Sequence, residues 1–233
     1  MTEGDRLQEL AFADEPRSGT ASRFAFVRPG DPEATEILLI RHAQMPETTD
    51  PNLDQPLTPL GIEQAAVLAA YLATKPLAAV YASPTLRTRQ TAAAIARDHG
   101  LEVLIDDDLR ELEAYFPEGK GLADVFGAEE IAAVQAHFGS NRRWEVFRGY
   151  RETGAAAAAR LSRAVEAIIE RHPGGRVAAV SHGPMINAYL AGLLASPYDM
   201  LFPGRLTSVS VVLAKDSLRT VLVANSVAHF QTY

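Results

Sequence analysis

Three short apolar runs of the same form constrain the fold of this 233-residue chain more than any other feature. They cover residues 36–40, 77–81 and 176–180, and each is continuous rather than alternating in polarity. Runs of this kind are typical of central strands that are covered on both faces of a sheet. Polar residues follow each run, and they begin with Arg41-His42, Ser83-Pro84 and Ser181-His182.

Helical patterns separate and follow these runs. Start signals at Thr58-Pro59 and Ser83-Pro84 and a stop signal at Gly100 bound the first two. We expect helices over residues 58–74, 83–99, 153–171 and 184–195, strands at 208–213 and 219–224, and a further edge strand that Phe24–Val27 could add. Strands that alternate with helices predict an α/β fold: a three-layer αβα sandwich whose central sheet is mainly parallel.

The chain divides into an extension and one domain. Residues 1–33 are polar and rich in turn-forming residues, which predicts a partly flexible N-terminal extension. The pattern is compact from residue 34 to 233, where we expect a single catalytic domain with a lid insertion at about residues 112–150. In the helix expected over 153–171, Leu161, Val165 and Ile168 share an apolar face, and Arg160 is expected off that face.

Composition excludes several classes of function. The net charge of −7 argues against nucleic acid as a partner, because phosphate backbones need a basic face. The absence of cysteine excludes disulfides, thiolate metal sites and cysteine nucleophiles. No apolar stretch is long enough to span a bilayer, and the start does not resemble a secretory signal, so a cytoplasmic protein without membrane partners is expected.

Four basic side chains are expected at one edge of the sheet. Arg41, His42 and His182 follow strands, and Arg87 lies in the first turn of the helix after another strand, where a cation opposes the helix dipole unless an anion is present. The carboxyl ends of parallel strands meet at one edge, which is where ligands bind in such sheets. Arginine binds phosphate oxygens in bidentate fashion, and a histidine nitrogen can act as a nucleophile. The sequence therefore predicts an oxyanion site.

The same segments carry a family resemblance. The chain resembles the phosphoglycerate mutase-like histidine phosphatases in four sequence blocks, which occur in the order found in the family. The blocks are Leu39-Ile40-Arg41-His42-Ala43-Gln44, Leu57-Thr58-Pro59-Leu60-Gly61 with Gln64-Ala65, Ala82–Ala92 with its Ser-Pro and Arg-Thr-Arg-Gln-Thr-Ala segments, and Val180-Ser181-His182-Gly183. These blocks cover most of residues 36–195.

The resemblance implies a role for individual positions. His42 would be phosphorylated during turnover, and Arg41, Arg87 and His182 would hold the transferred phosphoryl group. Glu111 would protonate the leaving oxygen and then help to activate water. The implied activity is hydrolysis of a phosphorylated small molecule or a phosphoprotein. No metal or other cofactor is implied, because the arginines supply the positive charge.

Several assignments have alternatives. Glu111 belongs to the acidic run 106–113, which could simply be solvated, and Glu113 is the second candidate for the acid. The pair Arg142 and Arg143 could bind a distal anionic group of the substrate or lie on the surface of a lid helix.

Other basic residues receive no catalytic role. Arg89 is expected on a helix surface, and His229 could support the site from behind. His42 and His182 themselves could be core histidines, and Arg87 could form a surface pair, although the neighbouring motifs favour the catalytic interpretation.

Three functions remain open from the sequence. Mutases of this family typically continue the first motif as Arg-His-Gly-Glu-Ser followed by Trp-Asn, whereas this chain has Ala43-Gln44-Met45-Pro46 and a shorter segment after Glu111. Both differences favour a phosphatase over a cofactor-dependent phosphoglycerate mutase. The third reading is a catalytically weak phosphate-binding or scaffolding protein. The sequence does not decide whether the chain forms a homodimer.

Overall fold

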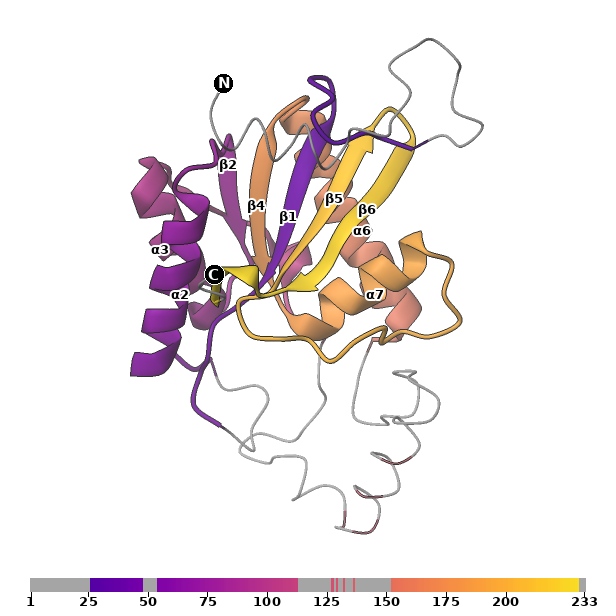
Figure 1. The fold of residues 1–233 in the computed structure, drawn as a ribbon. Coiled ribbons are helices and arrows are strands. Elements are labelled where there is room, and N and C mark those ends of the chain that lie inside the picture. The colour runs from indigo at the N-terminus through magenta and orange to yellow at the C-terminus, as the bar shows by residue number, and fades with distance from the viewer. Residues whose placement is uncertain are drawn as a thin grey trace.

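A six-stranded sheet in the order β3-β2-β4-β1-β5-β6 forms the centre of the computed structural model (Figure 1). The structure describes residues 26–47, 54–112 and 152–230 and the isolated positions 127, 129, 132 and 136. The strands are β1 (Thr35–Arg41), β2 (Ala79–Ala82), β3 (Val103–Ile105), β4 (Arg176–Ser181), β5 (Val209–Lys215) and β6 (Leu218–Ser226). The α-helices are α2 (Pro59–Leu72), α3 (Leu86–His99), α6 (Gly154–Arg171) and α7 (Gly183–Leu193), with short 3₁₀ turns η1 (Asp107–Leu109) and η3 (Ala228–Phe230).

The sheet is mainly parallel, as predicted. Strands β3, β2, β4 and β1 run parallel to one another, and the hairpin of β5 and β6 adds two antiparallel strands beside β1. The three central strands also end level, because Arg41 pairs with Ser181 and Ala82 pairs with Val180. The residues that follow these strands are therefore placed side by side at one edge.

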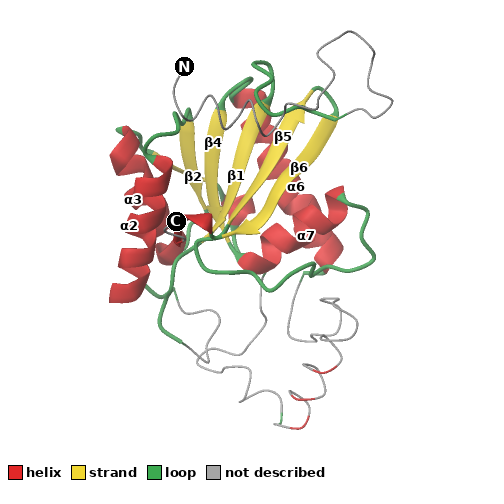
Figure 2. Cartoon of the chain, in the orientation of Figure 1, coloured by secondary structure: helices red, strands yellow, loops and turns green. Residues whose placement is uncertain are grey.

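Helices cover both faces of the sheet and complete the predicted αβα sandwich (Figure 2). Alternate residues of each strand enter different cores, since successive side chains of a strand point to opposite faces. Ile37 and Leu39 pack in the core beneath α6 and α7, whereas Leu38 and Ile40 pack in the core beneath α2 and α3. This two-sided burial explains why the strand sequences are continuously apolar.

The start of α2 is fastened to the chain that follows β1. Thr58 is the N-cap: its hydroxyl oxygen accepts from the Gly61 N–H at 3.0 Å and donates to Gln44 Oε1 at 2.7 Å. The Thr58 N–H donates to the Gln44 carbonyl at 3.0 Å, and Gln64 Oε1 accepts from the Gln44 N–H at 2.9 Å. These bonds hold the segment just beyond His42 against the helix.

Two boundaries differ from the sequence prediction. Helix α3 begins at Leu86 with Thr85 as its N-cap, rather than at Ser83-Pro84. The Ser83 hydroxyl does not cap the helix because it contacts His182 Nε2 at 2.9 Å instead. Strand β3 was not predicted, since its three residues at the edge of the sheet are too few to show a periodic pattern.

Two other predictions on the outer parts of the fold were wrong. Phe26 and Val27 form no strand; Val27 is instead held against β6 by one hydrogen bond of 3.0 Å from its N–H to Thr220 Oγ1. Arg160 is buried with 4% of its surface exposed, although the pattern of α6 placed it off the apolar face. Residues 1–25 lie outside the described part of the chain, so the flexibility of the N-terminal extension stays a prediction.

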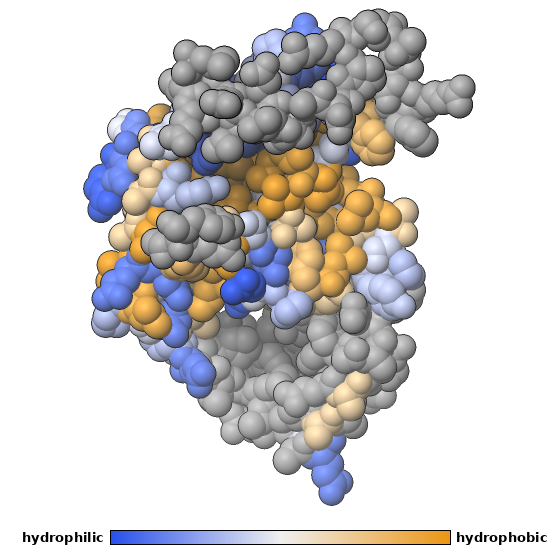
Figure 3. Space-filling model, in the orientation of Figure 1, coloured by the Kyte–Doolittle hydropathy of each residue, from blue (hydrophilic) through white to orange (hydrophobic). Residues whose placement is uncertain are grey.

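The surface of the hairpin side is apolar. In the space-filling view, apolar residues gather over the face of β5 and β6 that points toward the viewer (Figure 3). Leu222 and Val223 of β6 are 44% and 36% exposed. Within the described residues, no helix is long and apolar enough to cross a membrane.

The contact between Gly61 and Gln44 gives a prediction on stability. A Cβ at Gly61 would lie 2.0 Å from the Gln44 carbonyl oxygen, so Gly61→Ala must displace the chain after His42 or the start of α2. We expect it to lower the free energy of unfolding by about 1–3 kcal/mol, the usual cost of overpacking. Urea denaturation measures this. Gly192→Ala, whose new Cβ would meet only Ala158 Cβ at 3.9 Å, is the control, and equal stability of the two variants would contradict the prediction.

Candidate active site

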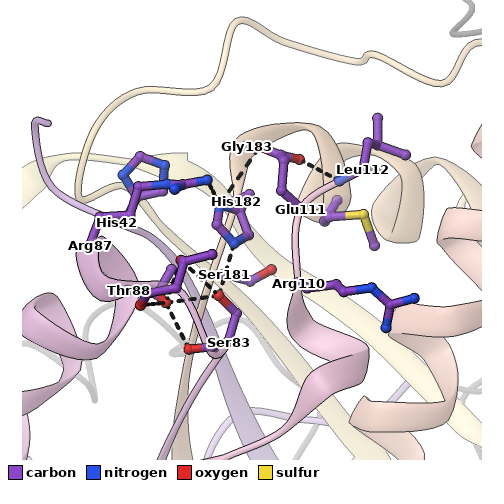
Figure 4. A network of polar contacts seen from close by, with 12 residues as sticks. His42, Ser83, Arg87, Thr88, Arg110, Glu111, Leu112, Ser181, His182 and Gly183 are labelled. Carbon is purple, nitrogen blue, oxygen red and sulfur yellow. Dashed lines mark hydrogen bonds and ion pairs between the residues drawn. The ribbon is translucent and has the colours of Figure 1, made fainter. Parts of the chain in front are cut away.

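The level ends of three parallel strands place three polar residues in one row. Ser83 follows β2, His182 follows β4 and His42 follows β1. The ladder extends one step further here: the His42 N–H donates to Ser181 O at 3.1 Å and the Ser83 N–H donates to Val180 O at 3.0 Å. The rings of His42 and His182 consequently meet edge to face, with 5.2 Å between their centroids. Figure 4 shows His182 between His42 and Glu111, with Ser83 on the sheet side.

His42 is held as a neutral imidazole with one free nitrogen. Its side chain is buried, and Nδ1 lies 2.8 Å from the Ala43 carbonyl oxygen. A carbonyl can only accept, so Nδ1 carries the proton and Nε2 keeps its lone pair. Burial lowers the pKa of His42 to about 3, with smaller contributions from Arg87 and Arg41. Desolvation is therefore the main reason that the imidazole stays neutral, and the arginine charges act in the same direction.

Arg41 and Arg87 bring two positive charges to the same place. Arg87 is 6% exposed, and its Nη2 lies 3.4 Å from His182 Nδ1. Arg41 donates through Nη1 to the Gly204 carbonyl. Among the described residues, the Nε atoms of both guanidinium groups are buried without a hydrogen-bond partner. Burial lowers both pKa values, and Glu111 opposes this effect in each case. Buried cations with unused donors form a site that favours an anion.

Two glycines make room for the Arg41 side chain. A Cβ at Gly183 would lie 3.3 Å from both Cδ and Nε of Arg41. A Cβ at Gly204 would lie 3.5 Å from Arg41 Nη1. The glycine that follows His182 therefore serves the position of Arg41 as well as the start of α7.

His182 is the N-cap residue of α7 and is completely buried. Its Nε2 lies 2.9 Å from Ser83 Oγ, which in turn lies 2.8 Å from Thr88 Oγ1. Burial lowers the pKa of His182 well below its usual value, so the ring carries one proton. Arg87 Nη2 can only donate, so in this arrangement Nδ1 accepts from it and the proton of His182 is on Nε2, which donates to Ser83 Oγ. When an anion takes the Arg87 hydrogen bond, the other tautomer, with the Ser83 hydroxyl donating to Nε2, leaves a proton on Nδ1 for that anion.

Glu111 lies on the other side of His182. Its Oε2 is 3.6 Å from His182 Nδ1, and its Oε1 accepts from the Leu112 N–H at 3.0 Å. Burial raises the pKa of Glu111, while the Leu112 hydrogen bond and the charges of Arg87 and Arg41 act in the opposite direction. A carboxyl group with a raised pKa at a site that favours an anion is suited to give and take protons. The structure thus brings together all five residues to which the sequence analysis gave roles in phosphoryl transfer.

The remaining sequence candidates do not all reach this site. Glu113, Arg142 and Arg143 lie outside the described residues, so their roles stay predictions. Arg89 is exposed on α3, as expected. No group of three or more His, Asp or Glu side chains in the described segments is arranged to hold a metal ion.

The structure adds supporting residues that sequence reasoning missed or left open. Ser83 was assigned only as a helix start, yet it orients His182. His229 Nε2 lies 3.0 Å from Thr207 Oγ1, and the Thr207 N–H donates to the His42 carbonyl at 3.4 Å. His229 is thus connected to the backbone of His42 through Thr207, as its suggested supporting role requires. Arg160 contacts the backbone of the loop that carries Glu111. No periodic pattern marks residues of this kind, because each depends on a contact between distant segments.

Comparisons with known proteins identify the family of this chain. The family model of the histidine phosphatase superfamily (branch 1) matches residues 37–227, and the chain belongs to this family. A metal-independent phosphoserine phosphatase from Arabidopsis thaliana is 32% identical over 212 residues, which are 86% of this chain and 85% of that protein. A probable phosphoglycerate mutase GpmB from Yersinia enterocolitica is 28% identical over 166 residues, 70% of this chain and 76% of the relative.

The fold is found in a solved structure as well. The crystal structure of phosphoglycerate mutase from Bacillus anthracis superposes with a TM-score of 0.72 at 20% identity, and covers 87% of this chain and 97% of that one. The phosphoglycerate mutase-like fold expected from the sequence is thereby confirmed.

The neutral state of His42 predicts how stability depends on pH. The folded pKa of about 3 lies below the unfolded value, near 6.5, so between these values the unfolded chain binds more protons and stability rises with pH. We expect His42→Gln to reduce the slope of the unfolding free energy against pH by up to about 1.4 kcal/mol per pH unit in this window. Urea denaturation between pH 4 and 7 measures it. Equal slopes in the two proteins would show that His42 titrates normally.

Proposed function

We propose that this protein is a phosphomonoester hydrolase whose catalytic cycle passes through a phosphohistidine on His42. One observation carries the proposal: the unprotonated Nε2 of His42 lies in a site with the buried Arg87, the partly buried Arg41 and an acid of raised pKa. A neutral imidazole is the nucleophilic form. Guanidinium groups fit the oxygens of a phosphoryl group and stabilise its charge.

The first half of the cycle transfers the phosphoryl group to the enzyme. Nε2 of His42 attacks phosphorus, and the ester P–O bond breaks with its electron pair on the leaving oxygen. Glu111 gives its proton to that oxygen, so the product leaves as a neutral alcohol. A raised pKa favours the protonated form of Glu111, which is the form that this step uses.

The second half returns the enzyme to its starting state. Glu111, now a carboxylate, takes a proton from water as the water oxygen attacks phosphorus. The N–P bond breaks, its electron pair returns to Nε2 of His42, and inorganic phosphate leaves. Arg41, Arg87 and His182 hold the phosphoryl oxygens in both halves, so positioning and electrostatics supply most of the catalysis.

The first substrate to test is phosphoserine. The Arabidopsis relative bears the name of a phosphoserine phosphatase and matches most of both chains. We therefore propose a small phosphorylated metabolite as the substrate, ahead of a phosphoprotein. Arg142 and Arg143 remain the proposed partners of a second anionic group on it.

Phosphoglycerate mutase activity is the second candidate, since the Yersinia relative carries that name. The segment Ala43–Pro46 departs from the mutase motif, and the Gln44 side chain is engaged by Thr58 at the start of α2 rather than left for a substrate. Both points favour hydrolysis. Assays of phosphate release and of 2-/3-phosphoglycerate interconversion, run on one preparation, decide between them; faster interconversion would overturn the hydrolase proposal.

The phosphohistidine is the most direct test of the mechanism. We expect brief incubation with phosphoserine or p-nitrophenyl phosphate to leave acid-labile phosphate on His42, detected by mass spectrometry after an alkaline quench. His42→Ala should carry none and lose at least about 10³-fold in kcat, because the covalent step is removed. His99→Ala, at the far end of α3 from Arg87, is the control and should keep both properties. If His42 stays unlabelled and the wild-type protein releases phosphate no faster than the background seen with His42→Ala, the phosphohistidine mechanism is wrong. A phosphate-binding or scaffolding protein is then the remaining interpretation.

Removal of the proton donor should depend on the leaving group. We expect Glu111→Gln to lower kcat/KM for phosphoserine by about 10²–10⁴-fold, because an alkoxide is a poor leaving group without protonation. The loss with p-nitrophenyl phosphate should be smaller, and the decline of kcat/KM that accompanies loss of the Glu111 proton as the pH rises should disappear. Glu102→Gln, an exposed carboxylate before β3, is the control. Equal losses on both substrates would exclude Glu111 as the donor.

A further inference from the structure

Arg160 is a buried charge whose partner binds it in a defined geometry. It lies in α6 with 4% of its surface exposed. Glu152 accepts two hydrogen bonds from it, Nε to Oε1 at 2.8 Å and Nη2 to Oε2 at 2.7 Å. This fork-to-fork pairing is available to arginine and not to lysine. A buried cation without such a partner would be strongly destabilising.

The other donors of Arg160 bind the backbone that leads to Glu111. Nη1 donates to the carbonyl oxygens of Asp108 and Arg110, each at 2.9 Å, and Nη2 donates to the carbonyl of Glu111 at 3.2 Å. One planar group thus fixes three carbonyl groups of the turn that begins with η1. We refer to Arg160, Glu152 and these carbonyls as the Arg160–Glu152 clamp.

The clamp acts on the residue that needs an accurate position. The bond from Arg160 to the Glu111 carbonyl restrains the backbone, and the side-chain torsions then decide where the carboxyl group lies. Those are limited by the Leu112 N–H at 3.0 Å and by His182 Nδ1 at 3.6 Å. A displacement of about 1 Å of a catalytic group can cost roughly 10²-fold in rate. The buried pair of Arg160 and Glu152 is therefore better explained by the need to position Glu111 than by a contribution to the stability of the fold.

The clamp also joins two segments that are distant in sequence. Asp108–Glu111 precedes residues 113–151, most of which lie outside the described part of the chain, and Glu152 follows them. Arg160 binds both flanks at once. No other described arginine of α6 does this: Arg163 pairs with the Asp108 carboxylate at 3.2 Å, but its side chain is 63% exposed. Exposed pairs of this kind contribute little.

We infer that Arg160, held by Glu152, is the positioning residue that sets the proton donor Glu111 against His182. The inference rests on the proposed role of Glu111 and assigns a reason for a buried charge that the catalytic steps do not use. Arg160 acts on Glu111 through hydrogen bonds to the backbone. Its charge also lowers the pKa of Glu111, but less than the charges of Arg87 and Arg41 do.

Arg160→Lys tests the inference, because it keeps the charge and loses the fork. We expect kcat/KM for phosphoserine to fall by about 10-fold to 10²-fold, with a clearly smaller fall for p-nitrophenyl phosphate, whose leaving group needs little protonation. The ratio between the two substrates is the readout, since general loosening of the fold would lower both together. Arg163→Lys is the matched control on the same helix and loop and should leave the ratio unchanged.

The outcomes separate this inference from the proposed function. A normal ratio in folded Arg160→Lys, with a changed ratio in Glu111→Gln, overturns the positioning role alone. An unchanged ratio in Glu111→Gln overturns the proton donor and the inference with it. Should Arg160→Lys not fold, Glu152→Gln keeps the shape of the clamp and removes only its carboxylate. We expect it to shift the ratio in the same direction, and a wild-type ratio there would also overturn the inference.

Discussion

Buried positive charge at the edge of a parallel sheet is the constraint on which this site depends. Arg87 is buried and Arg41 is partly buried next to two histidines, and their Nε groups have no hydrogen-bond partner in the described chain. Burial also keeps both histidines neutral and raises the pKa of Glu111, although the charges of Arg87 and Arg41 act against that rise. Such a site offers unused hydrogen-bond donors to an anion, and a neutral imidazole in it has an unprotonated nitrogen that can act as a nucleophile.

The sheet explains how much of this could be predicted from the sequence. Continuous apolar runs that end in Arg41-His42 and Ser181-His182 mark central strands and the residues at their ends. Parallel pairing then places those ends together without further information, because the register aligns Arg41 with Ser181. The fold and the central histidines and arginines were predictable for that reason. Glu111 was predictable only through the family resemblance, since its loop has no periodic pattern.

The missed features share a physical cause. Ser83 looks like a helix start in the sequence, but its hydroxyl is used by a histidine 99 positions later in the chain. Arg160 looks like a residue of the polar helix face, yet it is buried because carbonyl groups and a carboxylate from other segments surround it. Helical periodicity predicts which face of a helix is apolar. It carries no information on polar groups that other segments place next to the helix, and these groups decide where a charged side chain can be buried.

The Arg160–Glu152 clamp has a consequence for how such enzymes diversify. Among the described residues, the contacts that fix Glu111 from behind come from residues before position 113 or after position 151. This part of the anchorage of the proposed proton donor does not depend on the sequence between those positions. The lid insertion predicted at about residues 112–150 is the segment in which we expect substrate selectivity, because loops on a rigid scaffold commonly carry it. Exchange of residues 113–151 between family members is accordingly a rational route to altered selectivity.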